Sequence, residues 1–215
     1  MAHLYTCSVM AIALHEIPNL MTGSALEKQQ SAQSDVAWSL EELGGRLVEI
    51  RSVGPAASLV FAVRLVLDAQ RRHEPVVWIC ALDSCFFPAD VARNGVELDE
   101  LPVVRMAGAQ KAAVAADKLV RSGAFGLIVM DLGEDPWFAD ALQKRLAHHA
   151  EEHHTTILCL TEERRDSRTL GSLVSLRAEV TRSDERHCVL RVTRDKRRRP
   201  GWSIVEECHG TVGMR

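Results

Sequence analysis

The chain has 215 residues, of which 47% are hydrophobic and 26% are charged, as is typical of a globular protein with a sizeable core. No apolar run is long enough to cross a membrane, which excludes a transmembrane helix within these residues. The net charge of -3 hides an asymmetry, because residues 164–215 carry 13 Lys and Arg against 7 Asp and Glu. A basic C-terminal segment is typical either of a face directed at an acidic partner, such as nucleic acid, or of a solvated hairpin.

The N-terminal residues 1–35 are expected to form a flexible tail and docking segment. Residues 7–14 are apolar, but no basic residues precede them and no small-residue cleavage site follows, so we predict no signal peptide. The six cysteines form no C-x-x-C pair, and Cys80, Cys159 and Cys188 lie in predicted strands, where cysteine acts as a small buried hydrophobe. We therefore expect a reduced, cytoplasmic protein.

Strand and helix patterns alternate along the chain. Apolar runs suited to buried strands occur at residues 46–50, 75–82, 101–106, 125–131 and 155–161. Helical patterns occur at residues 58–72, 109–123 and 136–152, the last with Pro136 in its first turn. This alternation predicts a mostly parallel sheet with helical crossovers.

The pattern changes near residue 172. Residues 173–182 and 187–195 alternate apolar and polar side chains, which predicts an antiparallel hairpin, and residues 202–208 could add a further strand. We therefore predict one α/β domain over residues 36–215, with a mostly parallel central sheet flanked by helices and a C-terminal antiparallel β-hairpin.

The segment after the first strand has the layout of a phosphate-binding loop, G-x-x-x-x-G-K-[ST]. Gly54 holds the first glycine position, and the loop runs on through Ser58. Leu59, Val60 and Phe61 then replace the second glycine, the lysine and the hydroxyl residue. Each charge-assisted hydrogen bond lost costs about 1.5–3 kcal/mol, and a triphosphate beside apolar side chains would be unpaired. We therefore expect no bound cofactor and no ATPase activity.

The order of these elements resembles the core of the RecA recombinase family over roughly residues 40–210. "GRLVEI" (45–50) followed by Gly-Pro is similar to the entry into the family's phosphate loop. "NGVELDEL" (94–101) is similar to the segment after the family's second strand, and "RVTRDK" (191–196) to a basic pair at a strand end. The most specific match is "LVRSGAFGLIVMD" (119–131), which resembles the helix leading into the Walker B strand.

The resemblance places Asp131 at the Walker B acid and Asp83 near the family's catalytic acid. Because the phosphate loop has lost its polar groups, we interpret both acids as relics rather than magnesium ligands. The intervals that correspond to the family's two DNA-binding loops, residues 132–136 and 162–171, are short, and the first is acidic. We therefore expect weak or no direct DNA binding.

Two other clusters are candidate sites. Basic residues near the end of the predicted hairpin could contact DNA phosphates or a partner, or could form a solubilising loop. They are Arg194, Lys196, Arg197, Arg198 and Arg199. His149 and His153 lie one helical turn apart, a spacing that can bind a metal, but no third ligand of fixed spacing supports it, so we predict no metal site.

Aromatic residues mark two further positions. Trp38 and Leu40 are predicted to seat the N-terminal segment on the domain. Trp137 and Phe138 are predicted to open a helix and to lie in the core, with an exposed partner contact as the alternative.

A RecA-like frame without nucleotide chemistry resembles the ImuA-type accessory proteins of damage-induced mutagenesis. The resemblance implies binding to an ImuB-type Y-family polymerase homologue, to RecA, or to both, and indirect action with an error-prone replicative-type polymerase. It also implies an acceptor surface for a RecA-like N-terminal segment, which could instead serve homodimerisation. Two alternatives are a SulA-type division inhibitor that binds FtsZ, and a nucleotide-dependent enzyme whose rebuilt site uses Asp83 and Asp131.

Overall fold

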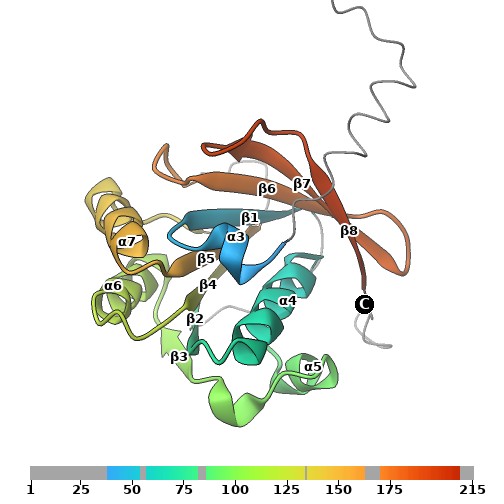
Figure 1. Cartoon of the computed structure of the whole chain (residues 1–215), viewed down its shortest axis with the longest axis horizontal. Coiled ribbons are helices and arrows are strands. Elements are labelled where there is room, and N and C mark those ends of the chain that lie inside the picture. Colours follow the sequence, from blue (N-terminus) through green and yellow to red (C-terminus); the bar gives the residue numbers. More distant parts are fainter. Residues whose placement is uncertain (1–37, 54–56, 82–85, 134, 163–169, 209–215) are drawn as a thin grey trace, which may run out of the picture. The chain divides into compact units, whose positions relative to one another are not determined.

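Eight strands form one sheet in the order β3-β2-β4-β5-β1-β6-β7-β8 (Figure 1). The structure, a computed structural model, describes residues 38–53, 57–81, 86–133, 135–162 and 170–208. The predicted tail lies outside these residues, as do Gly54, Asp83 and most of the interval 162–171. The strands are β1 (Leu47–Val53), β2 (Val76–Ala81), β3 (Val103–Met106), β4 (Leu127–Gly133), β5 (Thr156–Glu162), β6 (Leu176–Arg182), β7 (His187–Asp195) and β8 (Ser203–Glu207).

Neighbouring strands run parallel from β3 across to β6, and β6, β7 and β8 are antiparallel to one another in turn. The predicted α/β class, with a mostly parallel sheet and a C-terminal antiparallel hairpin, is therefore confirmed.

The helices are α3 (Leu40–Leu43), α4 (Ala57–Arg71), α5 (Pro88–Arg93), α6 (Ala109–Val120) and α7 (Asp140–Glu152), with a 3-10 turn at Leu98–Glu100. None of these helices is long and apolar enough to cross a membrane.

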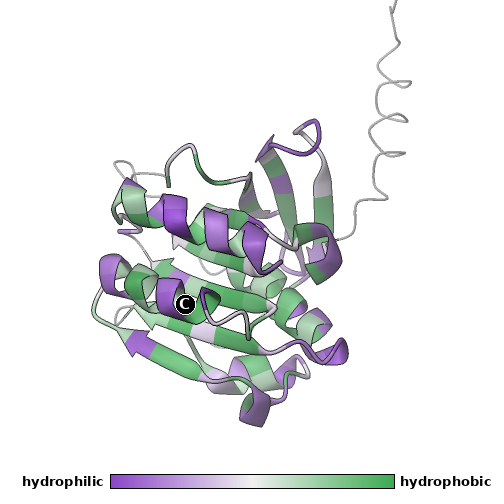
Figure 2. Ribbon diagram, turned by 60° about the vertical axis from the view of Figure 1, so that its left-hand side comes forward, coloured by the Kyte–Doolittle hydropathy of each residue, from purple (hydrophilic) through white to green (hydrophobic). Residues whose placement is uncertain are grey.

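Two apolar cores lie on the two faces of the sheet, because its central strands are buried on both sides. Figure 1 shows α4 and α5 over one face and α6 and α7 over the other. Along β4, Val129 faces the α4 side, whereas Ile128 and Met130 face α6 and α7. Figure 2 shows the same division, with hydrophobic residues along the strands and hydrophilic residues on the outer faces of the helices.

The start of α7 differs from the prediction. The helix begins at Asp140 rather than near Pro136. Phe138 is fully buried in the core beside α6, whereas Trp137 is 51% exposed, so only one of the two aromatic residues is a core residue. The preceding segment is held by side chains, because Ala139 N donates to Gln110 Oε1 at 3.0 Å and Gln143 Nε2 donates to the Phe138 carbonyl at 3.2 Å.

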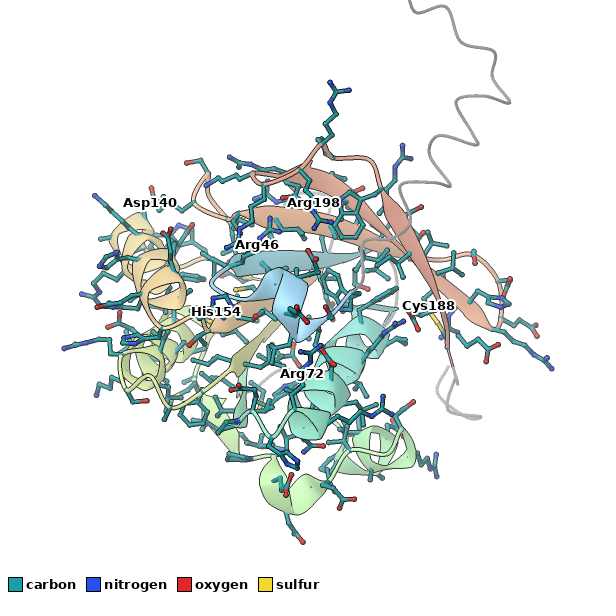
Figure 3. The ribbon with its side chains drawn as sticks, in the orientation of Figure 1. Arg46, Arg72, Asp140, His154, Cys188 and Arg198 are labelled. Carbon is teal, nitrogen blue, oxygen red and sulfur yellow. A yellow bond between two sulfur atoms is a disulfide. The ribbon has the colours of Figure 1, made fainter. Side chains whose placement is uncertain are left out.

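The C-terminal hairpin closes the α4 side of the core and contains a disulfide. The structure joins Cys188 of β7 to Cys208, which follows β8, with their Cα atoms 6.0 Å apart (Figure 3). Cys188 is buried in a strand as predicted, but it is paired with Cys208, 20 positions away, which the sequence analysis did not predict. Cys80 and Cys159 are free and buried, as predicted. Desolvation raises the pKa of the Cys159 thiol, which keeps it protonated and unreactive.

Candidate functional site

The segment that the sequence analysis compares with a phosphate loop follows β1, where an open α/β sheet normally binds its ligand. β1 lies between β5 and β6 in the sheet. After β1 the chain passes through α4 to β2, on the β5 side of β1, and it returns later to form β6 on the other side of β1. Ligands bind outside the carboxyl ends of parallel strands at such a reversal of strand order. The site therefore lies between Val53, at the end of β1, and the first turn of α4.

The first turn of α4 is joined to the apolar core. Phe61 is fully buried, and its ring meets Trp38 edge to face, with ring centres 6.1 Å apart and an interplanar angle of 85°. The indole Nε1 of Trp38 donates to the Phe61 carbonyl at 3.0 Å. Leu59 and Val60 are partly buried against the same core, and Ser58 is buried. Trp38 and Leu40 are buried in the same core, at 2% and 7% exposure; the N-terminal segment that they are predicted to seat lies outside the described residues.

The candidate Walker B acid lies two strands away from β1 in the sheet. Asp131 is near the end of β4, in register with Cys80 of β2 and Leu160 of β5, and its exposure is 8%. The interpretation of Asp131 as a relic remains a prediction.

A buried acid that the sequence analysis did not identify lies inside β1. Glu49 is fully buried, and its Oε2 accepts from Arg177 Nε of β6 at 2.6 Å. Its Oε1 accepts from Leu170 N at 3.2 Å and from Thr161 Oγ1 at 3.4 Å. Arg177 also donates to the Leu170 carbonyl. This network fixes the chain where it returns to the sheet after β5. A charged residue within the apolar run "LVEI" was the signal that could have revealed it.

The basic cluster lies at the opposite end of the strands from the segment that follows β1. Asp195, at the end of β7, pairs with the start of β6, and β6 starts beside the start of β1. The turn is held there by hydrogen bonds from Lys196 Nζ to the Leu173 carbonyl at 3.2 Å and from Arg197 Nη2 to the Gly44 carbonyl at 3.1 Å. The phosphate-loop segment and the basic cluster, two candidate sites predicted from the sequence, therefore do not lie together.

An ion-pair group supports this turn. Arg46 and Asp195 pair at 2.5 Å with almost no exposure, and Arg198 pairs with Glu42 of α3 at 2.7 Å. Burial lowers the pKa of Arg46. Figure 3 shows Arg46 and Arg198 close together near β1. Arg194 is half-buried, and the other four predicted contacts, Lys196, Arg197, Arg198 and Arg199, are exposed, three of them while also bonded within the fold. Part of the positive charge therefore supports the fold, and the predicted DNA contact stays a prediction.

The histidines predicted at helical spacing do lie together at the end of α7. The rings of His149 and His153 stack with centres 6.1 Å apart. Glu152 joins them, because its Oε2 lies 2.9 Å from His149 Nδ1.

Comparison with known proteins links the chain to RecA over part of its length. It is 33% identical over 87 residues to RecA of Fusobacterium nucleatum, which covers 40% of this chain and 23% of that protein. It is 31% identical over 119 residues to RecA of Teredinibacter turnerae, and 30% identical over 121 residues to RecA of Dichelobacter nodosus. These two matches cover 55% and 56% of this chain.

The chain spans only about a quarter to a third of the length of these relatives. No family profile matches the chain. The matches support a relationship to the RecA-like superfamily, which agrees with the α/β fold.

Proposed function

We propose that this chain is a RecA-like accessory protein in damage-induced mutagenesis, in which DNA is synthesised past lesions, and that it works without ATP hydrolysis. The observation that carries this proposal is the full burial of Phe61 at the position where a phosphate loop has its magnesium-binding hydroxyl. The partial similarity to RecA proteins supports a setting in DNA repair.

The first turn of α4 offers a nucleotide little to bind. A phosphate loop works through converging backbone N–H groups and a lysine. Here the side chains that follow Ser58 are apolar, and two of them, Leu59 and Val60, pack against the core. We expect the dissociation constant for Mg-ATP to be larger than about 100 μM, because two or three charge-assisted contacts are missing.

Titration calorimetry with Mg-ATP and an ATPase assay test this half of the proposal. Asp131→Ala is the control: an enzyme with a rebuilt site that uses Asp131 would hydrolyse ATP and lose that activity in the variant. Tight ATP binding or Asp131-dependent turnover would overturn the non-catalytic assignment.

In this proposal the protein acts in the cytoplasm by binding an ImuB-type Y-family polymerase homologue, RecA, or both. Its effect on an error-prone replicative-type polymerase is indirect and depends on these partners. Binding to RecA would modulate its filaments. The outer strands of the sheet support docking, since an edge can accept an added strand. Both carry an exposed apolar residue, Val103 of β3 at 38% and Val205 of β8 at 59%.

The test is binding of the purified chain to RecA and to the C-terminal region of an ImuB-type protein, each with and without its RecA-like segment. We expect deletion of that segment to abolish binding. Val103→Lys or Val205→Lys should weaken binding, while Val114→Lys on α6, 40% exposed, is the matched control. Affinities unchanged by the deletion would contradict the docking mode. Self-association without partner binding, or inhibition of FtsZ assembly, would contradict the function.

A further inference from the structure

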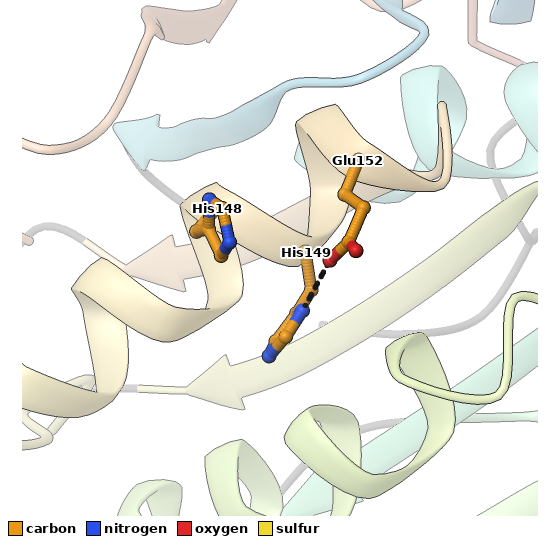
Figure 4. Close-up of side chains that lie close together, drawn as sticks. All are labelled: His148, His149 and Glu152. Carbon is orange, nitrogen blue, oxygen red and sulfur yellow. Dashed lines mark hydrogen bonds and ion pairs between the residues drawn. The ribbon is translucent and has the colours of Figure 1, made fainter.

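The last turns of α7 bring two imidazoles close to one carboxylate (Figure 4). Ligand atoms of His148, His149 and Glu152 all lie within 4.8 Å of one another. Figure 4 shows His149 directed at Glu152, whose Oε2 is 2.9 Å from His149 Nδ1. His153 follows, with its Nε2 3.8 Å from the same oxygen.

Helical spacing explains this grouping. Residues three and four positions apart are neighbours on a helix surface, so Glu152 lies near both His149, to which it is hydrogen-bonded, and His148. The opposite side of α7 is anchored in the core, because Leu146 and Ala150 are fully buried. The cluster therefore lies on a fixed element, which holds a set of ligands more accurately than a loop does.

We propose that His148, His149 and Glu152 form a binding site for a divalent transition-metal ion of the Zn²⁺ type. Imidazole nitrogen and carboxylate oxygen are ordinary zinc ligands, whereas Mg²⁺ and Ca²⁺ prefer oxygen alone. Three ligands from the protein leave a fourth position for water or for a group from a partner. The sequence argued against a metal because the His149 and His153 pair lacked a third ligand; Glu152 supplies it.

The geometry needs only a small contraction. Neighbouring ligand atoms on a tetrahedral zinc ion, with bonds of about 2.1 Å, lie roughly 3.4 Å apart. His148 and Glu152 are exposed and His149 is half-buried, so rotation of the two exposed side chains can close the distance. His153 is close enough to replace one ligand or to orient the carboxylate.

The local charge also favours a cation. The site lies at the C-terminal end of α7, where the helix dipole is negative and attracts positive charge.

Titration of the full chain with Zn²⁺ at neutral pH, by calorimetry or equilibrium dialysis, tests this site. We expect binding in the micromolar range that weakens at least tenfold in His149→Ala and in Glu152→Gln. His187→Ala is the matched control. His187 also pairs with a carboxylate three residues away, Asp184 at 2.9 Å, on an exposed surface. It should bind Zn²⁺ like the parent chain.

Co²⁺ gives the second readout, since its visible spectrum separates nitrogen and oxygen ligands from thiolates. We expect a spectrum without thiolate charge-transfer bands that is lost in His149→Ala. Thermal melting without metal should be the same for parent and variants, because these side chains lie at the surface. No binding, binding unchanged in His149→Ala and Glu152→Gln, equal loss in His187→Ala, or a thiolate spectrum would each overturn the proposal.

Discussion

Trp38 donates its indole hydrogen to the Phe61 carbonyl at 3.0 Å, and the same two rings meet edge to face. The contact ties the chain just before α3 to the first turn of α4. Such an aromatic pair contributes about 0.5–1.5 kcal/mol beyond the area that it buries. The position that the sequence compares with a phosphate loop is therefore a packing junction of the α4 side of the core.

Truncation of Phe61 should destabilise the domain. Phe61→Ala should lower the free energy of unfolding by about 3–5 kcal/mol, because the ring is fully buried. Trp137→Ala is the control, since that ring is 51% exposed and its loss should cost less than about 1 kcal/mol. Urea denaturation followed by circular dichroism measures both. Equal losses would show that Phe61 does not hold the junction together.

Rebuilding the phosphate-loop residues should not create an ATP site. Leu59→Gly, Val60→Lys and Phe61→Thr together restore the pattern, but they also remove the buried ring and the apolar contacts of the first turn. We expect a largely unfolded chain, and calorimetry should detect no Mg-ATP binding. A folded triple variant with micromolar affinity for ATP would contradict this.

The Glu49–Arg177 pair should be sensitive to the loss of either partner alone. Glu49→Gln or Arg177→Met should lower the free energy of unfolding by about 3–5 kcal/mol, because each leaves a buried charge unpaired. The double variant Glu49→Leu and Arg177→Met should lose less unfolding free energy than the sum of the losses in the two single variants. The exposed pair of Arg93 and Asp90 is the control, where Arg93→Ala should cost less than about 1 kcal/mol. Additive losses in the double variant would argue against the coupling.

The sequence predicted the order of strands and helices because the local signals agree. The apolar runs of the central strands and the alternating pattern of the hairpin each match the observed pairing. The start of α7 was placed too early because Pro136 is a good first-turn residue, whereas the burial of Phe138 decides the helix boundary. Tertiary packing of this kind has no local signal.

The side-chain partners were harder to predict than the elements. Arg197 and Arg198 read as free basic residues, because Gly44 and Glu42 are more than 150 positions away in the sequence. Glu49 and Arg177 meet only because β1 and β6 are neighbours in the sheet. Cys188 and Cys208 come together only once β8 has paired with β7. Contacts between residues far apart in the sequence depend on the order of the strands in the sheet, which the hydrophobic periodicity of the sequence does not specify.

The basic turn should divide into structural and surface arginines. Arg197→Ala should lower stability by about 1 kcal/mol, because its hydrogen bond to the Gly44 carbonyl is lost, whereas Arg199→Ala should leave stability unchanged. DNA binding, measured by fluorescence anisotropy, should be weak, should fall steeply with salt, and should depend on Arg199. Tight binding that persists at high salt, or that survives Arg199→Ala, would contradict this division.

The disulfide should stabilise the edge of the sheet at β8. Cys188 and Cys208 close a loop of 20 residues, for which chain entropy gives about 3 kcal/mol. Reduction of the parent chain should therefore lower the free energy of unfolding by about 2–4 kcal/mol and speed hydrogen exchange in β8. The double variant Cys188→Ser and Cys208→Ser is the control, since reductant should then change neither quantity. Alkylation and mass measurement give a direct check: both cysteines should react only after reduction of the unfolded chain. If both are alkylated without reductant, the two thiols are free, and β8 is held without a covalent link to β7.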